Sequence, residues 1–150
     1  MVDEVKKGYY LLFIDGGIRA NDRGQAEGAI GVILREPDCG AVLAEVPEKV
    51  GPVGSPQEAE YRALIRGLKL AAEEGLPYIA VFSDSANVVN QVTGRWNKNE
   101  QATELYEEVA DALKSFTKWQ LSWVPREMNK DADDLVNQAF KGEPVTHATD

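Results

Sequence analysis

Short apolar runs separated by polar, glycine-containing segments fill the first third of the chain, and this pattern predicts β-strands. Residues 9–14 and 28–34 are apolar and rich in aromatic and β-branched side chains, which is typical of buried strands. Residues 41–50 alternate apolar and polar positions and predict a third strand. We expect these strands to form an antiparallel meander, with residues 18–27 as a polar loop. Gly31, inside the second strand, marks a position where another backbone can approach closely.

The rest of the chain combines helical periodicity with two further apolar runs. Ser55, Pro56 and Glu58 form the signature of a helix start, with a capping residue, a first-turn proline and a capping-box glutamate, and we expect this helix to end near Glu74. The later elements are a strand over 78–83, helices over 86–92 and about 101–116, a strand over 118–124, a loop over 125–128 and a helix capped by Asn129. The order βββαβααβα predicts an α/β fold with a five-stranded mixed sheet and helices on both faces.

The composition is that of a soluble globular protein, with 150 residues, 43% of them hydrophobic and 27% charged. We predict a single domain with a core over about 8–140 and a loose C-terminal tail over 141–150. Cys39 is the only cysteine, which excludes an intramolecular disulfide and favours a reducing compartment. The apolar runs are too short for a signal peptide or a membrane span. We therefore expect a cytoplasmic protein with no membrane partner.

The net charge of −9 argues against a nucleic-acid partner, because affinity for phosphates comes largely from Lys and Arg. A local basic groove or a bound Mg²⁺ can override the charge of the whole molecule. The charge alone therefore does not exclude such a partner.

Two aspartates follow predicted buried strands. Asp15 comes directly after the first apolar run and before Gly16-Gly17, and Asp84 comes directly after the run at 78–83. A charge at the end of a buried strand costs free energy unless it is paired or binds a metal. Turn formation or helix capping is the alternative explanation for both residues, whereas ligand sites commonly lie beyond the carboxyl ends of strands.

Glu60 lies on the apolar side of its predicted helix. At about 100° per residue, the charged residues of this helix gather on one side and its apolar residues on the other, and Glu60 falls within the apolar arc. Glutamate is almost never buried without a partner. We therefore interpret Glu60 as a functional carboxylate and not as a surface charge.

The last predicted helix carries three aspartates. Its apolar stripe consists of Ala132, Leu135, Val136, Ala139 and Phe140. Asp134 points nearly opposite to this stripe, while Asp131 and Asp133 flank it on either side. The spacing slightly favours Asp133 as the inward-facing residue but leaves both candidates open.

Carboxylates from two strand ends and two helices suit the binding of divalent hard cations. Mg²⁺ prefers oxygen ligands, and two such ions roughly 3.5–4 Å apart activate water and stabilise the leaving oxygen in phosphodiester cleavage. The single histidine, His147, lies in the predicted tail, so a Ser-His-Asp triad and a zinc site lack support. The chain also has no phosphate-binding glycine loop of the known kinds.

Several motifs occur together in a characteristic order. They are Phe13-Ile14-Asp15-Gly16-Gly17 with Asn21, residues 28–34, Ala59-Glu60-Tyr61-Arg62-Ala63-Leu64, Ser83-Asp84-Ser85 followed by 88–92, Gly94-Arg95-Trp96, residues 124–127, and Asn129-Lys130-Asp131-Ala132-Asp133. With this set the chain resembles the type 1 ribonuclease H family from Leu11 to about Phe140. Each motif alone is weak, but their order together with the predicted elements is specific.

The resemblance implies hydrolysis of the RNA strand of RNA–DNA hybrids by a monomer that uses two Mg²⁺ or Mn²⁺ ions per site with substrate. The metal-binding and catalytic carboxylates of the family fall on Asp15, Glu60, Asp84 and Asp133, because the Asn-x-x-Ala-Asp motif selects Asp133 over Asp131. The positions expected to contact the hybrid are Gly16, Gly17, Asn21, Ser85, Trp96 and Lys98. Contacts of this kind distinguish RNA from DNA through ribose 2′-OH groups and A-like shape.

The sequence departs from the family pattern at three places. Many members carry a histidine before the last helix that assists product release; here that loop has none, and Arg126 is the cationic group expected to act in catalysis. The alternative is that Arg126 is a loop arginine paired with a nearby carboxylate. The basic insertion found in some members is also absent, and the loop after Asp15 contains Asn21-Asp22-Arg23-Gly24 in place of the usual Asn-Pro-Gly.

Two other functions fit the same fold. One is a nuclease of the resolvase or transposase type that acts on DNA, which the Ala-Glu-Tyr and Asn-x-x-Ala-Asp segments disfavour. The other is a catalytically silent module that binds hybrids. Four intact carboxylates argue against a pure binder, since it would gain affinity for phosphates by losing negative charge.

Overall fold

The computed structural model of the chain describes residues 7–94, 103–141 and 146–147. Its elements are β1 (Tyr10–Ala20), β2 (Ala26–Arg35), β3 (Val42–Pro52), α1 (Pro56–Glu73), β4 (Tyr78–Ser83), α2 (Ala86–Val92), α3 (Thr103–Leu113), β5 (Lys118–Trp123), the 3₁₀ turn η2 (Arg126–Met128), α4 (Lys130–Ala139) and β6 (Thr146–His147). Every predicted helix and strand is present in the predicted order.

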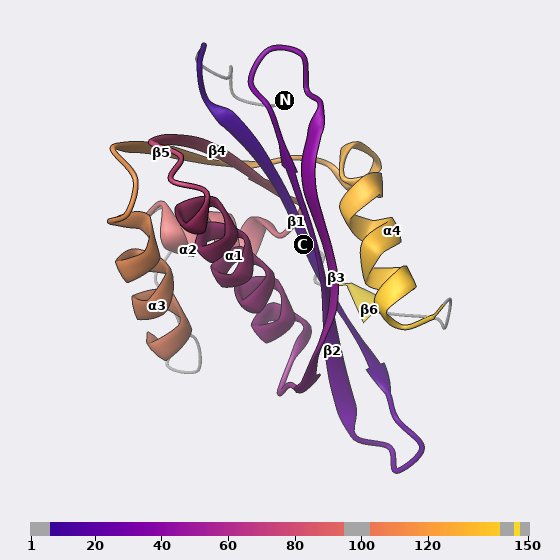
Figure 1. Cartoon of the computed structure of the whole chain (residues 1–150). Helices are drawn as coiled ribbons and strands as arrows, with labels where there is room; N and C mark the ends of the chain where they lie inside the picture. The colour runs from indigo at the N-terminus through magenta and orange to yellow at the C-terminus, as the bar shows by residue number, and fades with distance from the viewer. Residues whose placement is uncertain (1–6, 95–102, 142–145, 148–150) are drawn as a thin grey trace.

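The strands form one mixed sheet with the order β3-β2-β1-β4-β5. β1, β2 and β3 pair as an antiparallel meander, while β4 and β5 are added in parallel to β1. Helices α1, α2 and α3 lie on one face of the sheet and α4 lies on the other (Figure 1). The predicted α/β architecture, with a five-stranded mixed sheet covered on both faces, is confirmed.

β1 is longer than the sequence pattern predicted. It runs through Asp15 as far as Ala20 and pairs with β2 from Leu11 to Ala20. Half of the predicted loop at 18–27, namely residues 18–20 and 26–27, therefore belongs to strands. The pairing partner lies in another segment, which explains why the apolar run alone understated the strand. The parallel pairing with β4 ends at Phe13. Asp15 therefore lies just past the end of the parallel ladder, although it is not the end of its strand.

Two other boundaries differ from the prediction. The tail after Phe140 was expected to be loose, but Thr146–His147 pair with Ile18 and Gly17 of β1 as the short strand β6. Helix α3 ends at Leu113, three residues earlier than predicted, and residues 101–102 lie outside the described part.

Side-chain capping was predicted at the starts of α1 and α4, and of these two helices it occurs only in α1. Ser55 caps α1 by accepting a hydrogen bond from the Glu58 N–H at 3.1 Å, as predicted. Asn129 occupies the corresponding position of α4, but its side chain caps no N–H group of that helix. Its Nδ2 donates instead to the backbone carbonyl of Ile14 at 2.8 Å. The prediction of Asn129 as a side-chain cap is therefore wrong, because its side-chain amide forms a hydrogen bond with strand β1 instead.

Close contacts between helices and sheet depend on two glycines. A Cβ atom at Gly31 would lie 2.1 Å from the Ala132 carbonyl oxygen of α4, and one at Gly16 would lie 2.5 Å from the Ala59 carbonyl of α1. Real Cβ atoms do not approach this closely, so only glycine allows these packing distances. The prediction that another backbone approaches Gly31 is confirmed.

We predict that Gly31→Ala destabilises the protein by about 1–3 kcal/mol or more, the range for overpacking a well-packed core, because α4 must move away from β2. Gly54→Ala is the matched control, since a Cβ there meets only the Glu58 Oε1 atom at an ordinary 3.4 Å. Urea unfolding of both variants checks this. Equal stability of the two would contradict the close packing of α4 on β2.

Candidate metal centre

Three carboxylates from separate elements converge inside the molecule. Asp15 on β1, Glu60 on α1 and Asp84 after β4 each offer an oxygen, and these oxygens all lie within 4.8 Å of one another. All three side chains are buried, Asp15 and Glu60 completely. The structure thus brings together three of the four carboxylates predicted as metal ligands.

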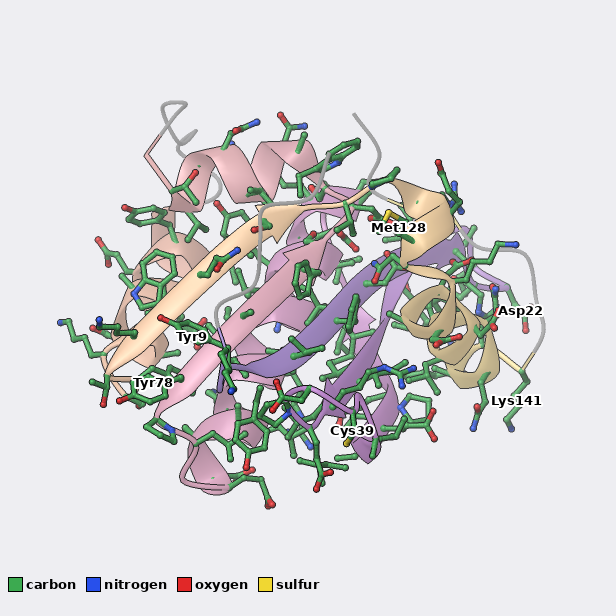
Figure 2. The ribbon with its side chains drawn as sticks, turned by 90° about the horizontal axis from the view of Figure 1, so that it is seen from above. Tyr9, Asp22, Cys39, Tyr78, Met128 and Lys141 are labelled. Carbon is green, nitrogen blue, oxygen red and sulfur yellow. The ribbon has the colours of Figure 1, made fainter. Side chains whose placement is uncertain are left out.

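The sheet topology explains why the two aspartates meet. Asp84 follows the last residue of β4, and Asp15 lies just past the last residue of β1 that pairs with β4. Figure 2 shows Tyr9 and Tyr78 toward one end of β1 and β4, and Met128 toward the opposite end, beside the start of α4. Side chains that follow neighbouring parallel strands gather at one edge of a sheet, which is where ligand sites form in such folds.

Glu60 reaches this edge from α1. Its burial confirms its predicted place on the apolar side of the helix. The approach is possible because Gly16 leaves room for the backbone of Ala59 and Glu60. The N–H of Gly16 donates a hydrogen bond to Glu60 Oε1, and Ser83 Oγ lies 3.5 Å from Glu60 Oε2, at the long limit of a hydrogen bond.

The local environment disfavours the ionised form of Glu60. Burial raises the pKa of Glu60 well above its ordinary value of 4.5, and the neighbouring Asp15 and Asp84 carboxylates raise the pKa further. The Gly16 N–H acts in the opposite direction. Like charges this close, with little water around them, need a compensating cation or a proton.

The set of donor atoms fits a hard divalent cation. All three groups are carboxylates, which Mg²⁺ and Mn²⁺ prefer over softer ligands. The only cysteine, Cys39, is exposed at a hairpin turn and is not part of the cluster. Bound divalent cations would offset the repulsion between these buried side chains.

The fourth predicted ligand, Asp133, lies outside the three-carboxylate group. It is half-buried on α4, with its Oδ1 atom covered. Its competitor Asp131 is 67% exposed and forms an ion pair with Arg35 of β2 at 2.7 Å. Because this ion pair engages Asp131 on the β2 side, Asp133 is the better candidate for the fourth carboxylate.

Arg126 is exposed in the turn η2, between β5 and α4. Within the described part of the chain it forms no ion pair. The alternative that Arg126 is a loop arginine paired with a carboxylate therefore finds no support here, and its guanidinium is accessible to a ligand.

The predicted hybrid-contacting residues are spread over several places. Gly16, Gly17 and Ser85 lie beside the carboxylates, and Ser85 caps α2 by accepting a hydrogen bond from the Val88 N–H at 3.4 Å. Asn21 holds the turn between β1 and β2, where its Oδ1 accepts hydrogen bonds from the Arg23 and Gln25 N–H groups.

Asn21 follows Asp15 by six residues. At about 3.3 Å per residue of strand, this spacing corresponds to about 20 Å. The structure therefore does not bring Asn21 to the carboxylates. Trp96 and Lys98 lie outside the described residues.

Two side chains that were not among the predicted site residues hold the backbone of the cluster. The indole N–H of Trp123 donates to the Asp84 carbonyl at 3.2 Å, and the Asn129 amide donates to the Ile14 carbonyl. Both bonds connect distant segments, so local periodicity carries no signal for them.

None of the described helices is long and apolar enough to cross a membrane.

Comparisons with known proteins agree with this architecture. Residues 13–139 match the family model described as reverse transcriptase-like. The Bifunctional protein Rv2228c of Mycobacterium tuberculosis is 35% identical over 137 residues, which cover 91% of this chain and 36% of that protein. The chain thus spans about a third of the length of this relative.

Two solved structures are similar over nearly their whole length. RNase H1 from the halophilic archaeon Halobacterium salinarum is 33% identical, with a TM-score of 0.81 over 91% of this chain and 100% of the other. LC11-RNase H1, solved in complex with an RNA/DNA hybrid, is 28% identical, with a TM-score of 0.75 over 86% and 94% of the two chains. With its motifs, sheet order and carboxylate cluster, the chain belongs to the type 1 ribonuclease H family.

Proposed function

We propose that this protein is an endoribonuclease that hydrolyses the RNA strand of RNA–DNA hybrids with divalent metal ions. The observation that carries the proposal is the convergence of Asp15, Glu60 and Asp84, buried and within 4.8 Å of one another. The relative LC11-RNase H1, whose structure contains an RNA/DNA hybrid, supports the choice of substrate.

In this proposal Asp15, Glu60 and Asp84 hold Mg²⁺ or Mn²⁺, and Asp133 contributes the fourth carboxylate. When bound, a pair of such ions supplies an activated water and stabilisation of the leaving oxygen. The Gly16 N–H orients the Glu60 carboxylate toward the cluster. Burial of the three carboxylates limits the water around them, which strengthens their interaction with a cation.

Arg126 is the cationic side chain proposed to act beside this centre. It is exposed on the segment that leads from β5 into α4, where many family members carry a histidine. We assign it a role in product release, because an arginine side chain acts as a permanent cation. Gly16, Gly17, Asn21, Ser85, Trp96 and Lys98 remain the proposed contacts to the hybrid.

The central test offers labelled RNA–DNA hybrid, duplex RNA and duplex DNA to the protein, with Mg²⁺ or with EDTA. We expect cleavage of the RNA strand of the hybrid, and only with Mg²⁺. Cleavage of duplex DNA instead would assign the fold to a DNA nuclease. Hybrid binding without cleavage would identify a silent binding module.

Glu60→Gln should lower hybrid cleavage by at least a hundredfold while the fold is kept, because the amide is nearly isosteric but is a poor Mg²⁺ ligand. Glu73→Gln makes the same substitution on an exposed face of the same helix and should cleave like the wild type. Steady-state cleavage assays measure both variants. Turnover of Glu60→Gln within tenfold of the wild type would remove Glu60 from the site.

Arg126→Ala should lower turnover by about tenfold or more, the low end of the range for losing a hydrogen bond that involves a charged group, while affinity for uncleaved hybrid in Ca²⁺ changes little. Lys130→Ala is a matched control, because Lys130 is also an exposed cation close to the start of α4. Cleavage kinetics and equilibrium binding separate the two effects. A loss confined to affinity would make Arg126 a phosphate contact and contradict the catalytic role.

Asp84→Asn should raise the melting temperature in EDTA at neutral pH and abolish activity. At the 4.8 Å limit of the cluster, two carboxylate charges repel by about 3.5 kcal/mol at an effective dielectric near 20, before protonation and relaxation. Mg²⁺ should stabilise the wild type more than the variant, by mass action on the folded state. Thermal melts with and without Mg²⁺ test this. A lower melting temperature for Asp84→Asn in EDTA, with equal Mg²⁺ shifts, would mean that the carboxylates form no common metal site.

A further inference from the structure

Asn129 connects two parts of the candidate metal centre. Its Nδ2 donates a hydrogen bond to the carbonyl of Ile14, the residue before Asp15, at 2.8 Å and out of contact with solvent. Its own carbonyl accepts a hydrogen bond from the N–H of Asp133 at 3.1 Å. One residue therefore contacts the backbone next to one carboxylate and begins the helical turn that carries another.

The side chain of Asn129 is not used as its position in the chain would suggest. Asparagine at the start of a helix normally accepts a hydrogen bond from an N–H of the first turn, and the Asn129 side chain makes no such bond in α4. Its Oδ1 is buried and accepts no hydrogen bond from the described residues. Both features disfavour stability, so the bond to Ile14 is kept at the expense of the helix cap.

The location of Ile14 explains what this bond does. The parallel pairing of β1 with β4 ends at Phe13, so the Asn129 amide provides a donor to a carbonyl just past that ladder. Asn129 and Asp133 are four residues apart and lie on the same side of α4. A fixed Asn129 therefore also fixes the height and rotation of Asp133 over β1.

A second contact holds α4 on the other side. Asp131 pairs with Arg35 of β2 at 2.7 Å in a largely exposed position. This ion pair attaches the helix to β2, away from the three-carboxylate cluster. The two contacts share one helical turn but differ in which strand they hold, which makes them a matched pair for an experiment.

We propose that Asn129 is a positioning residue whose bond to Ile14 sets the placement of Asp133 relative to Asp15, Glu60 and Asp84, and thereby the affinity of the centre for divalent ions. Asn129 itself binds no ion. The inference rests on the proposed function, since it assumes that the four carboxylates hold metal.

The test uses Asn129→Ser and Asn129→Ala in the whole chain. Both variants lose the donor to Ile14, but serine can cap α4 and alanine cannot. We expect both to bind Mn²⁺ about tenfold more weakly by calorimetry, the low end of the range for residues that orient metal ligands. Asn129→Ser should melt no lower than Asn129→Ala. Asp131→Asn, which breaks the contact with Arg35, should bind Mn²⁺ within twofold of the wild type.

Kinetics give a second measure that simple loss of stability would not reproduce. For Asn129→Ser, kcat at low Mg²⁺ should fall and should recover partly as Mg²⁺ is raised, while KM for the hybrid stays within twofold. In a background of Asp133→Asn, the further change Asn129→Ser should alter Mn²⁺ affinity less than twofold, because the side chain that Asn129 positions has already been neutralised.

Three results would overturn the inference. The first is that Asn129→Ser binds Mn²⁺ as tightly as the wild type. The second is that Asn129→Ser still lowers Mn²⁺ affinity tenfold when it is added to Asp133→Asn. The third is that Asp131→Asn loses as much Mn²⁺ affinity as Asn129→Ser. If the wild type binds no Mn²⁺, the proposed function and this inference fail together. If the wild type binds Mn²⁺ and Asn129→Ser does so equally well, only the inference fails.

Discussion

The close approach of α1 to β1 at Gly16 is the contact on which the candidate site depends. The missing side chain lets the backbone of Ala59 and Glu60 pass within a distance that a Cβ atom would block. The N–H of the same glycine then donates to the Glu60 carboxylate that this approach brings in. One residue therefore provides both the space for the third carboxylate and its orientation toward Asp15 and Asp84.

Three carboxylates in the interior oppose the stability of the fold. Burial and the two aspartates raise the pKa of Glu60, which means that the surrounding core favours its neutral form. The apolar core around Leu12, Ile14 and Leu64 offsets this cost, since stabilisation by buried apolar surface grows with area and needs no local partner. A site of this kind is expected where function and stability conflict, and it gives the buried charge a functional explanation.

The sequence predicted what local patterns encode and missed what distant contacts decide. Glu60 on the apolar side of its helix and Asp84 after an apolar strand were both visible from periodicity, and both are buried where expected. β1 extends past Asp15 because β2 pairs with it. β6 pairs with Gly17 and Ile18 of β1, which lie beyond the last residue of β1 that pairs with β4. Asn129 has the sequence signature of a cap, yet its partner is 115 residues away. No window along the chain contains that partner.

Two side chains at the ends of the segment from β5 to α4 form hydrogen bonds with the backbone that carries the carboxylates. Trp123, at the end of β5, holds the carbonyl of Asp84, and Asn129, at the start of α4, holds the carbonyl next to Asp15. A hydrogen bond to the backbone fixes a carboxylate without occupying any of its oxygens, so the ligand atoms stay available to a cation. Loss of a group that orients a metal ligand typically lowers metal affinity by about 10–100-fold. In the proposed metal centre, we infer that the carboxylates alone do not determine the affinity, because the side chains that hold their backbones set how closely they converge.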